Sequence, residues 1–401
     1  MIYVTKNRTR RDGGAAMFQF YMPTQIQFGA GKAQQLPSLL KDLSLGSTLL
    51  VVSDKGVVAA GLVTPILDLL ANNGFQVHLF TQVAQNPRDA DCLVGVDAFH
   101  AVGAQAVIAI GGGSAMDTAK AIALLAKTGG TPQEYVDGLR SYESTYPVVC
   151  LPTTAGTGSE VTRSSVITEA TTHRKMTLKH NLMRPVLAVL DPLLTLSVPP
   201  AVTAATGVDA LVHAIEGATC TLSTPITQAF GARAMREIIP ALPRAVANGQ
   251  DVEARTLMLQ GSLLAGLCFG NADVAAVHCL AEALGGLYDT PHGVANAIFL
   301  PHVLRFNAQA HQSLHADLGR TMGFAQEADA DELAVTKLVD GIAEYTALLN
   351  IPTLRQLGYV QPSDFPRLVE LAFQNGSTPS NVRPISKDDY AAILEATYLA
   401  E

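Results

Sequence analysis

The stretch AVIAIGGGSAMDTAK, residues 106–120, joins a strand pattern to a helix pattern through three glycines. Residues 106–110 form a short apolar run, and the spacing predicts a helix from about 115 to 127. Glycines let the backbone approach a ligand closely, and the free N–H groups of a helix start favour an anion. Ser114 is placed to cap this helix. The order predicts a phosphate-binding turn, although a plain tight turn would use the same residues.

The segments on either side of this turn repeat the alternation of strand and helix. Strands are expected at residues 47–54, 75–80, 147–154 and 186–192, with helices at 62–74 and 88–103. Short apolar runs separated by helices are typical of a parallel sheet covered by helices on both faces.

The character of the chain changes near Pro199. Strand-like runs become rare, and long segments rich in alanine and leucine follow. We therefore expect an α/β dinucleotide-binding domain over residues 17–197 and an all-helical domain over 198–401. We expect residues 1–16 to be a flexible extension outside both domains.

Composition narrows the class of protein. The 401 residues exceed one ordinary core, and 48% hydrophobic against 15% charged residues argues against disorder. The net charge of −8 argues against a nucleic-acid partner, and no apolar run reaches the ~18 residues of a membrane span. Five scattered cysteines without a C-x-x-C pair suit a reducing cytoplasm and argue against a thiolate zinc site. We expect a cytoplasmic protein without nucleic-acid or membrane partners.

Two further segments could serve a dinucleotide. Asp54 ends the strand at 47–54, where dinucleotide folds place an acid for the ribose hydroxyls. An aspartate at this point also commonly caps a helix or forms a turn. The loop LPTTAGTGSEVT, residues 151–162, can offer hydroxyls and backbone amides to a cofactor, or it can simply connect two elements.

Ligand-type side chains interrupt the apolar sequence of the second half at Asp209, His213, His278 and His292. Asp209 and His213 are four residues apart and share one face of a helix. A buried aspartate is costly unless it is paired or coordinated, and this mixture of oxygen and nitrogen donors suits Fe²⁺ or Zn²⁺. Taken singly, each histidine could be a hydrogen-bonded core residue, and spacing alone does not exclude His302 as a ligand.

Taken together and in order, the motifs of this chain resemble those of the iron-containing (group III) alcohol dehydrogenases, especially the lactaldehyde/propanediol oxidoreductase-type members. The motifs are IQFGAGK, VVSDKG, QNPRDAD, GGGSAMDTAK, LPTTAGTGSEVT, DPLLTLSVPP, GVDALVHAIEGA and TPHGVANAIFLPHVLRFN. The resemblance runs from about Phe18 to the C-terminus. It implies a dehydroquinate-synthase-like fold with the active site in the cleft between an α/β domain and a helical domain. We also expect a homo-oligomer, either a dimer or a larger assembly.

The resemblance also implies roles for single residues. The implied metal ligands are Asp209, His213, His278 and His292, and His302 is not among them. The implied cofactor residues are Gly112, Gly113 and Ser114 at the pyrophosphate, Asp54 at the adenosine ribose, Asn86 nearby, Thr153, Thr154 and Thr157 along the cleft, and Lys175 on the dinucleotide. The expected cofactors are NAD, with NADP disfavoured by the charge of Asp54, and Fe²⁺, with Zn²⁺ as the alternative.

Two positions depart from the family pattern. Glu282 stands where the family usually has a histidine near the nicotinamide with a proton-relay role, and Ser164 stands where several relatives have an asparagine near the substrate. Glu282 follows His278 by four residues, so both lie on one helix face. It could be an extra metal ligand, a proton relay, or a carboxylate that orients an imidazole, and we expect one of the last two roles.

The expected activity is hydride transfer between a nicotinamide and a small alcohol or diol, with the metal polarising the substrate oxygen. The sequence shows no arginine cluster that would clamp a dicarboxylate. The alternatives within the fold are a maleylacetate-type reductase and a hydroxyacid–oxoacid transhydrogenase. A dehydroquinate-synthase-like lyase would need several cationic residues, with which the helical half is sparing. A NAD-binding module with purely structural polar residues would hold no stoichiometric metal.

Overall fold

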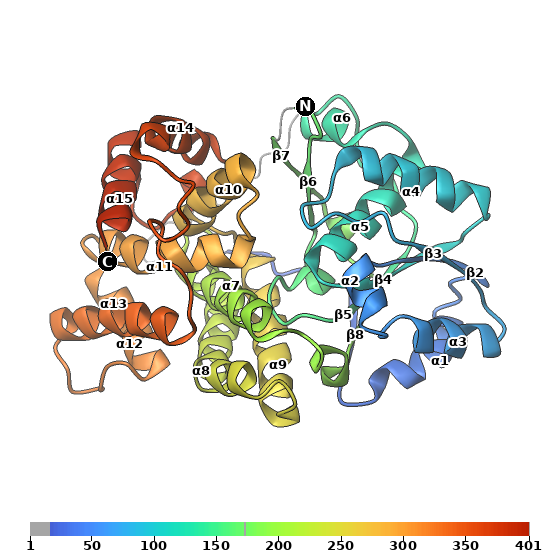
Figure 1. The fold of residues 1–401 in the computed structure, drawn as a ribbon, viewed down its shortest axis with the longest axis horizontal. Coiled ribbons are helices and arrows are strands. Elements are labelled where there is room, and N and C mark those ends of the chain that lie inside the picture. The colour runs from blue at the N-terminus through green and yellow to red at the C-terminus, as the bar shows by residue number, and fades with distance from the viewer. Residues whose placement is uncertain (1–16, 172–173, 401) are drawn as a thin grey trace.

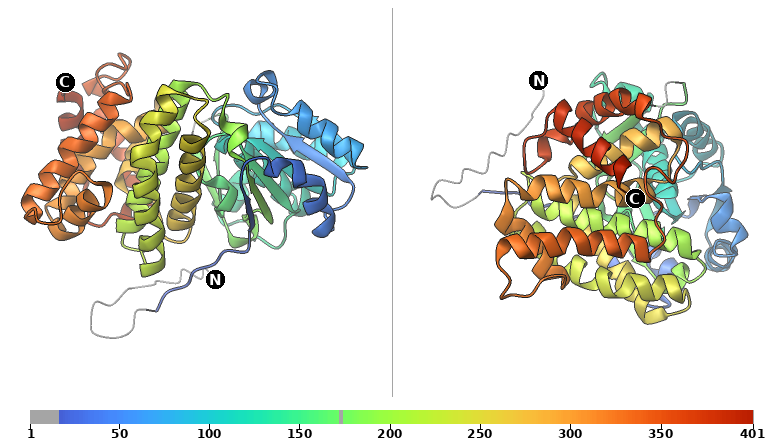
Figure 2. Two further views of the ribbon diagram at one scale, coloured as in Figure 1. Left: turned by 90° about the horizontal axis from the view of Figure 1, so that it is seen from below. Right: turned by 60° about the vertical axis from the view of Figure 1, so that its left-hand side comes forward.

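The computed structural model describes residues 17–171 and 174–400. An α/β half comes first and a helical half follows, and the two lie side by side (Figures 1 and 2). The extension expected at residues 1–16 lies outside the described residues.

Six parallel strands form the central sheet of the α/β half. Across the sheet they are β1 (Gln25–Phe28), β8 (Leu187–Leu190), β5 (Val148–Pro152), β4 (Ala106–Gly111), β2 (Thr48–Val52) and β3 (Gln76–Phe80). All residues of β4, β5 and β8 are buried, as continuous apolar runs predict for strands covered on both faces. The chain adds β3 on one side of β2 and β4 on the other, so the strand order reverses there. Ligands of open α/β sheets bind at the carboxyl ends of strands at such a reversal.

Helices cover both faces of this sheet (Figure 1). One face packs against α1 (Leu36–Asp42) and α3 (Thr64–Asn72), and the other against α4 (Asp89–Ala101) and α5 (Gly113–Thr128). The short helices are α2 (Lys55–Ala59) and α6 (Pro132–Val136). The expected parallel sheet with two helical layers is confirmed.

An antiparallel pair of strands stands apart from the main sheet. Its members are β6 (Ser164–Thr168) and β7 (Lys175–Lys179), and the sequence analysis predicts neither of them. Ile167, Met176 and Leu178 pack against Leu124 and Leu125 of α5. This packing fixes the place of β7, which lies beside the helical half (Figure 1).

The described residues from 200 to 400 contain helices and no strand, which confirms the expected helical half. The helices are α7 (Pro200–Thr219), α8 (Pro225–Ala247), α9 (Val252–Phe269), α10 (Ala276–Tyr288), α11 (His292–Ala308), α12 (Gln312–Met322), α13 (Asp331–Leu348), α14 (Phe365–Gln374) and α15 (Lys387–Leu399). Leucines of α9 pack against β8 and Val161, which joins the two halves through apolar contact. The domain boundary predicted between residues 197 and 198 falls just before α7.

The structure bears on the expectations about membrane spans and about the cysteines. Among residues 17–171 and 174–400, no helix is long and apolar enough to cross a membrane. All five cysteines are free and buried, so each acts as a small core residue. Burial raises the pKa of the Cys150 thiol to about 12, which leaves it in the inert protonated form.

Candidate metal and cofactor site

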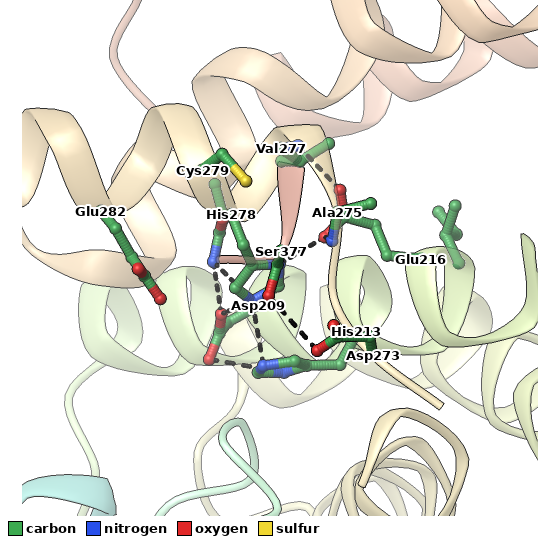
Figure 3. A network of polar contacts seen from close by, with 12 residues as sticks. Asp209, His213, Glu216, Asp273, Ala275, Val277, His278, Cys279, Glu282 and Ser377 are labelled. Carbon is green, nitrogen blue, oxygen red and sulfur yellow. Dashed lines mark hydrogen bonds and ion pairs between the residues drawn. The ribbon is translucent and has the colours of Figure 1, made fainter. Parts of the chain in front are cut away.

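The structure brings the four predicted metal ligands together from three helices. Asp209 and His213 lie one turn apart on α7, His278 lies on α10, and His292 is the first residue of α11. One ligand atom each of Asp209, His278 and His292 falls within 4.8 Å of the other two. His213 borders this group, with its Nε2 atom 3.0 Å from Nε2 of His278 (Figure 3). We call these four residues the Asp–His centre.

Burial and charge make the Asp–His centre suitable for binding a cation. The side chains of Asp209 and His278 are 3% exposed and that of His213 is 6% exposed, whereas His292 is 40% exposed. Burial opposes ionisation of Asp209, but the three histidines around it hold the pKa of its carboxyl below the ordinary value. Burial lowers the pKa of His213 to about 3, so its ring is neutral. A carboxylate and neutral imidazoles are typical ligands of zinc and iron.

A second buried carboxylate fixes the orientation of His278. Glu216 accepts a hydrogen bond from Nδ1 of His278 over 2.6 Å, and it also accepts the backbone N–H groups of Ala275 and Val277 (Figure 3). A carboxylate can only accept, so the proton of this bond sits on Nδ1 and leaves the Nε2 lone pair for the centre. Histidines that bind metals usually make such a second bond to a carboxylate or a carbonyl.

Asn296 lies among the ligand atoms from one turn further along α11 than His292. Its Nδ2 atom donates to Oδ1 of Asp209 over 2.7 Å, and it lies 3.2 Å from Nε2 of His292. Nδ1 of His213 and Oδ1 of Asn296 are buried without a hydrogen-bond partner. Converging lone pairs, unpartnered buried atoms and one carboxylate together fit a divalent cation.

The glycine turn after β4 lies directly against the threonine-rich loop after β5. A Cβ atom added at Gly113 would come within 2.7 Å of Thr157, and one at Gly112 within 3.2 Å of Thr154. Thr153 continues this contact, because its N–H donates to the carbonyl of Gly111. The bare backbone at the start of α5 therefore faces hydroxyl groups, a surface that fits the phosphates of a dinucleotide.

The structure corrects the predicted role of Ser114 as a helix cap. α5 already begins at Gly113, its N-cap is Gly112, and no side chain caps it. The Ser114 hydroxyl donates instead to the backbone carbonyl of Gln85. This bond ties the glycine turn to the loop that carries Asn86.

Asp54 lies where the sequence predicts, at the carboxyl end of β2 beside the glycine turn. Its Oδ1 atom accepts the N–H of Val57 over 3.0 Å and so caps α2, which is the common alternative for such an aspartate. Its Oδ2 atom lies 3.5 Å from the position that a Cβ atom on Gly111 would occupy. The helix cap uses Oδ1, whereas Oδ2 faces the glycine turn. A contact between Oδ2 and a ribose therefore stays a prediction.

Asn86 and Lys175 meet where the two halves of the chain face each other. The Lys175 ammonium donates to Oδ1 of Asn86 over 2.7 Å, and Nδ2 of Asn86 donates to Asp289 over 3.0 Å. Two predicted cofactor residues from separate segments are thus joined to the end of α10. Ser164, the first residue of β6, lies in the same strand pair as Lys175, and its carbonyl accepts from Lys120.

Profiles of two families match the chain. The profile described as "Iron-containing alcohol dehydrogenase" covers residues 23–192, and the profile described as "Fe-containing alcohol dehydrogenase family, C-terminal" covers residues 203–398. The chain belongs to the iron-containing alcohol dehydrogenase family. The predicted family, fold class and reaction class are therefore confirmed.

Relatives of this alcohol dehydrogenase match it over nearly its full length. It is 38% identical to the 1,3-propanediol dehydrogenase of Citrobacter freundii over 390 residues, which cover 95% of this chain and 99% of that protein. It is 35% identical to the NAD-dependent methanol dehydrogenase of Bacillus methanolicus over 381 residues, 94% of this chain and 99% of that one. The solved structure of a 1,3-propanediol oxidoreductase superposes with a TM-score of 0.91 at 36% identity and covers 95% of this chain and 100% of that chain. The protein is an oxidoreductase of CH–OH groups that uses a nicotinamide cofactor and a metal ion.

Glu282 of this alcohol dehydrogenase lies on α10, one turn after His278, outside the group of ligand atoms that fall within 4.8 Å. Its carboxylate accepts a hydrogen bond from Asn375 over 2.6 Å. Burial lowers the pKa of Lys175, and the negative charge of Glu282 opposes this effect. The role of Glu282 as a proton relay or an orienting carboxylate stays a prediction. His302 also lies outside the group, and burial lowers its pKa to about 4.

Two residues of the alcohol dehydrogenase site escape the sequence analysis. Glu216 lies seven residues after Asp209 on the same apolar helix, so the cost of burying a carboxylate applies equally to both. Asn296 lies four residues after His292, on the same helix face. The spacing signal for both is present in the sequence, but only the fold shows that they touch the ligands.

Proposed function

We propose that this alcohol dehydrogenase oxidises a small primary alcohol or diol with NAD and reduces the corresponding aldehyde with NADH. The observation that carries the proposal is the buried Asp–His centre, whose donors fit a divalent metal. The choice of a small alcohol or diol rests on the likeness to a methanol dehydrogenase and to 1,3-propanediol dehydrogenases.

We propose Asp209, His213, His278 and His292 as the metal ligands, with iron favoured by the family and zinc as the alternative. A divalent ion held there would supply Lewis acidity to the substrate oxygen. Glu216 keeps the His278 ring in the orientation and tautomer that coordination needs. We place a proton-handling role on the carboxylate of Glu282, which in its ionised form can accept the proton of the alcohol.

The cofactor site of this proposal follows the edge of the sheet. Gly112, Gly113 and Ser114 would hold the pyrophosphate, and Asp54 would contact the adenosine ribose. Thr153, Thr154 and Thr157 would line the cofactor, with Asn86 and Lys175 closing over it. The position of the glycine turn and Asp54 at the reversal of strand order supports this placement. NAD supplies the hydride acceptor, and the protein has to orient it.

The rival activities make different demands on the chain. A dehydroquinate-synthase-like lyase acts on a phosphorylated, carboxylated substrate and would need several cations near the Asp–His centre. The charge of Lys175 acts on His292 of this centre, and its ammonium donates to Asn86. This arrangement favours an uncharged alcohol over the substrates of the lyase, the maleylacetate-type reductase and the transhydrogenase.

A substrate panel tests the proposal. Purified protein loaded with Fe²⁺ or with Zn²⁺ is assayed with methanol, ethanol, 1,2-propanediol and 1,3-propanediol and with the matching aldehydes, each with NAD(H) and NADP(H). The proposal predicts the highest kcat/KM for a short alcohol or diol with NAD. Preference for maleylacetate or for a hydroxyacid–oxoacid pair without net NADH formation would contradict it.

We further propose a cytoplasmic homo-oligomer, a dimer or larger. Five reduced, buried cysteines support the reducing compartment. The oligomer rests on the resemblance to the family. Light scattering on the purified protein measures the assembly directly, and a monomer at micromolar concentration would contradict it.

A further inference from the structure

Both ends of α10 are bridged to the α/β half by acidic side chains. Just before its start, Asp273 accepts from the ammonium of Lys179 over 3.0 Å. At its end, Asp289 accepts from Asn86 over 3.0 Å and from Arg88 over 3.3 Å. Because α10 carries His278 and Glu282, these bridges hold the metal-binding helix against segments that the proposed function assigns to the cofactor.

The helix cap that Asp289 forms does not use its side chain. Asp289 ends α10 in the left-handed conformation, with φ 53° and ψ 25°, and its N–H donates to the carbonyl of Gly285. Glycine suits this cap position best, because it adopts positive φ without a steric cost. A carboxylate at this position adds nothing to the cap, but it does make the bonds to Asn86 and Arg88.

The bonds of Asp289 continue into the proposed cofactor site. Asn86 receives Lys175 on its carbonyl oxygen while its amide group donates to Asp289. The neighbouring Gln85 accepts from Ser114 at the glycine turn. On the other side, Asp289 lies three residues before the ligand His292 in the chain. One short path of contacts thus links the pyrophosphate turn to the Asp–His centre.

We propose that Asp289 is a positioning residue that latches the α10–α11 junction onto the loop of Asn86 and Arg88 and thereby tightens binding of the nicotinamide dinucleotide. We call the bonds of Asp289 to Asn86 and Arg88 the Asp289 latch. The inference rests on the cofactor placement proposed above. A dinucleotide held between two halves binds more weakly when the closed arrangement is less populated.

The size of the effect follows from the exposure of the latch. The Asp289 side chain is 60% exposed and that of Arg88 is 24% exposed, so the ion pair is partly screened by solvent. Exposed pairs of this kind change an equilibrium by a few-fold, and we expect the Kd of NADH to rise about two- to fivefold without the latch. Salt should weaken the latch in the same way, because it screens exposed charges within about 10 Å at 0.1 M.

The test compares two substitutions at one position in the metal-loaded protein. Asp289→Gly removes the latch and keeps the left-handed cap, and Asp289→Asn keeps an acceptor for Asn86 without the charge. Titration with NADH, followed by nucleotide fluorescence, should give a Kd about two- to fivefold higher for the glycine variant and an intermediate value for the asparagine variant. Asp340→Asn, in an exposed pair with Arg305 within the helical half, is the matched control and should leave the Kd unchanged.

Further readouts separate the latch from a general structural effect. In a double-mutant cycle, Arg88→Gln should weaken NADH binding less in the Asp289→Gly background than in the unsubstituted protein. The ratio of the two Kd values, glycine variant over unsubstituted protein, should fall toward one as salt is raised. Metal content should stay the same in both variants, since no ligand is touched.

A Kd for NADH that Asp289→Gly leaves unchanged at low salt would overturn the latch. Lys175→Met keeps this outcome distinct from a failure of the proposed cofactor site. If Lys175→Met weakens NADH binding while Asp289→Gly does not, the cofactor site holds and the latch is wrong. If neither variant changes the Kd, the cofactor does not lie on these residues and the latch falls with the placement on which it rests.

Discussion

Glu216 holds His278 by the Nδ1 atom of its ring, over 2.6 Å, while Nε2 of the same ring lies 3.0 Å from His213. Glu216 and His213 come from one helix, α7, so this helix supplies both a ligand and the group that orients a ligand on α10. The opposed bonds leave the His278 ring little freedom to rotate. Helix α7 therefore sets the orientation of this predicted ligand.

Glu216→Gln should lower metal affinity by about 10- to 100-fold, the usual effect of losing a carboxylate that orients a histidine ligand. The amide NH₂ group would replace an oxygen that now accepts hydrogen bonds, either Oε1, which accepts from Val277, or Oε2, which accepts from Ala275 and His278. Competition with a chelator of known affinity measures the change. Glu237→Gln, at a buried glutamate of α8 outside the centre, is the control. Equal metal affinity in the Glu216 and Glu237 variants would refute the orienting role.

Asp54→Asn should reduce the preference for NAD over NADP by about tenfold in the ratio of kcat/KM values. Two like charges at ~4 Å repel each other by on the order of 1 to 4 kcal/mol, and 1.4 kcal/mol is a factor of ten. Asparagine caps a helix as well as aspartate does, so α2 should be kept. Steady-state kinetics with both cofactors decide the matter. Equal use of NADP and NAD by the unsubstituted enzyme would count against the ribose contact.

Glu282→Gln should leave metal content intact, lower kcat and change its dependence on pH. The amide keeps the shape and can still accept from Asn375, but it carries no charge and cannot take up a proton. Metal analysis and kcat measured across the pH range separate the possibilities. Loss of the metal would make Glu282 a ligand, and an unchanged pH profile would make it a bystander.

Glu160→Gln should stabilise the protein more at pH 8 than at pH 5. Burial raises the pKa of Glu160 to about 7, against the opposing effects of a backbone N–H and of Lys120. A folded-state pKa above the unfolded value means that the protonated form favours folding, and this contribution is lost as pH rises from about 4.5 to about 7. The loss is on the order of 3 kcal/mol, and the glutamine variant avoids it because it never ionises.

Thermal unfolding of both proteins at the two pH values measures this difference. Glu143→Gln, at an exposed position, should show no such dependence and serves as the control. A gap in Tm between the Glu160 variant and the unsubstituted protein that stays constant from pH 5 to pH 8 would show that Glu160 is not held protonated.

The sequence predicts the buried strands and the edge strand β3, but it misses β1, β6 and β7. β4, β5 and β8 are continuous apolar runs because helices cover both faces, and such runs are visible without any fold. β1 is a partly exposed edge strand of four residues, and β7 alternates polar with apolar residues over five. Without a continuous apolar run, a strand of four or five residues carries too weak a pattern to be told from a loop.

The residues of the site also differ in whether the sequence alone reveals them. Asp209 and His213 are visible because a carboxylate and an imidazole stand out in an apolar helix. The bond between Asn86 and Asp289 joins residues 203 positions apart, and both are ordinary polar residues in loops or at a helix end. The predicted cap at Ser114 is wrong, because the helix starts two residues earlier than a serine cap requires and the Ser114 hydroxyl donates to the carbonyl of Gln85. Contacts between the two halves depend on the docking of the halves, which no local pattern encodes.

Metal stoichiometry and turnover, measured on one set of proteins, test the central claim most directly. Unsubstituted enzyme, His278→Ala, His292→Ala and the control His302→Ala are stripped of metal, reloaded with Fe²⁺ and assayed for NADH formation from 1,3-propanediol. The account predicts one ion per chain and full activity in the unsubstituted enzyme and in His302→Ala, with turnover abolished and metal retention weakened in the other two. Full turnover by His278→Ala or His292→Ala, or by the metal-free enzyme, would contradict it.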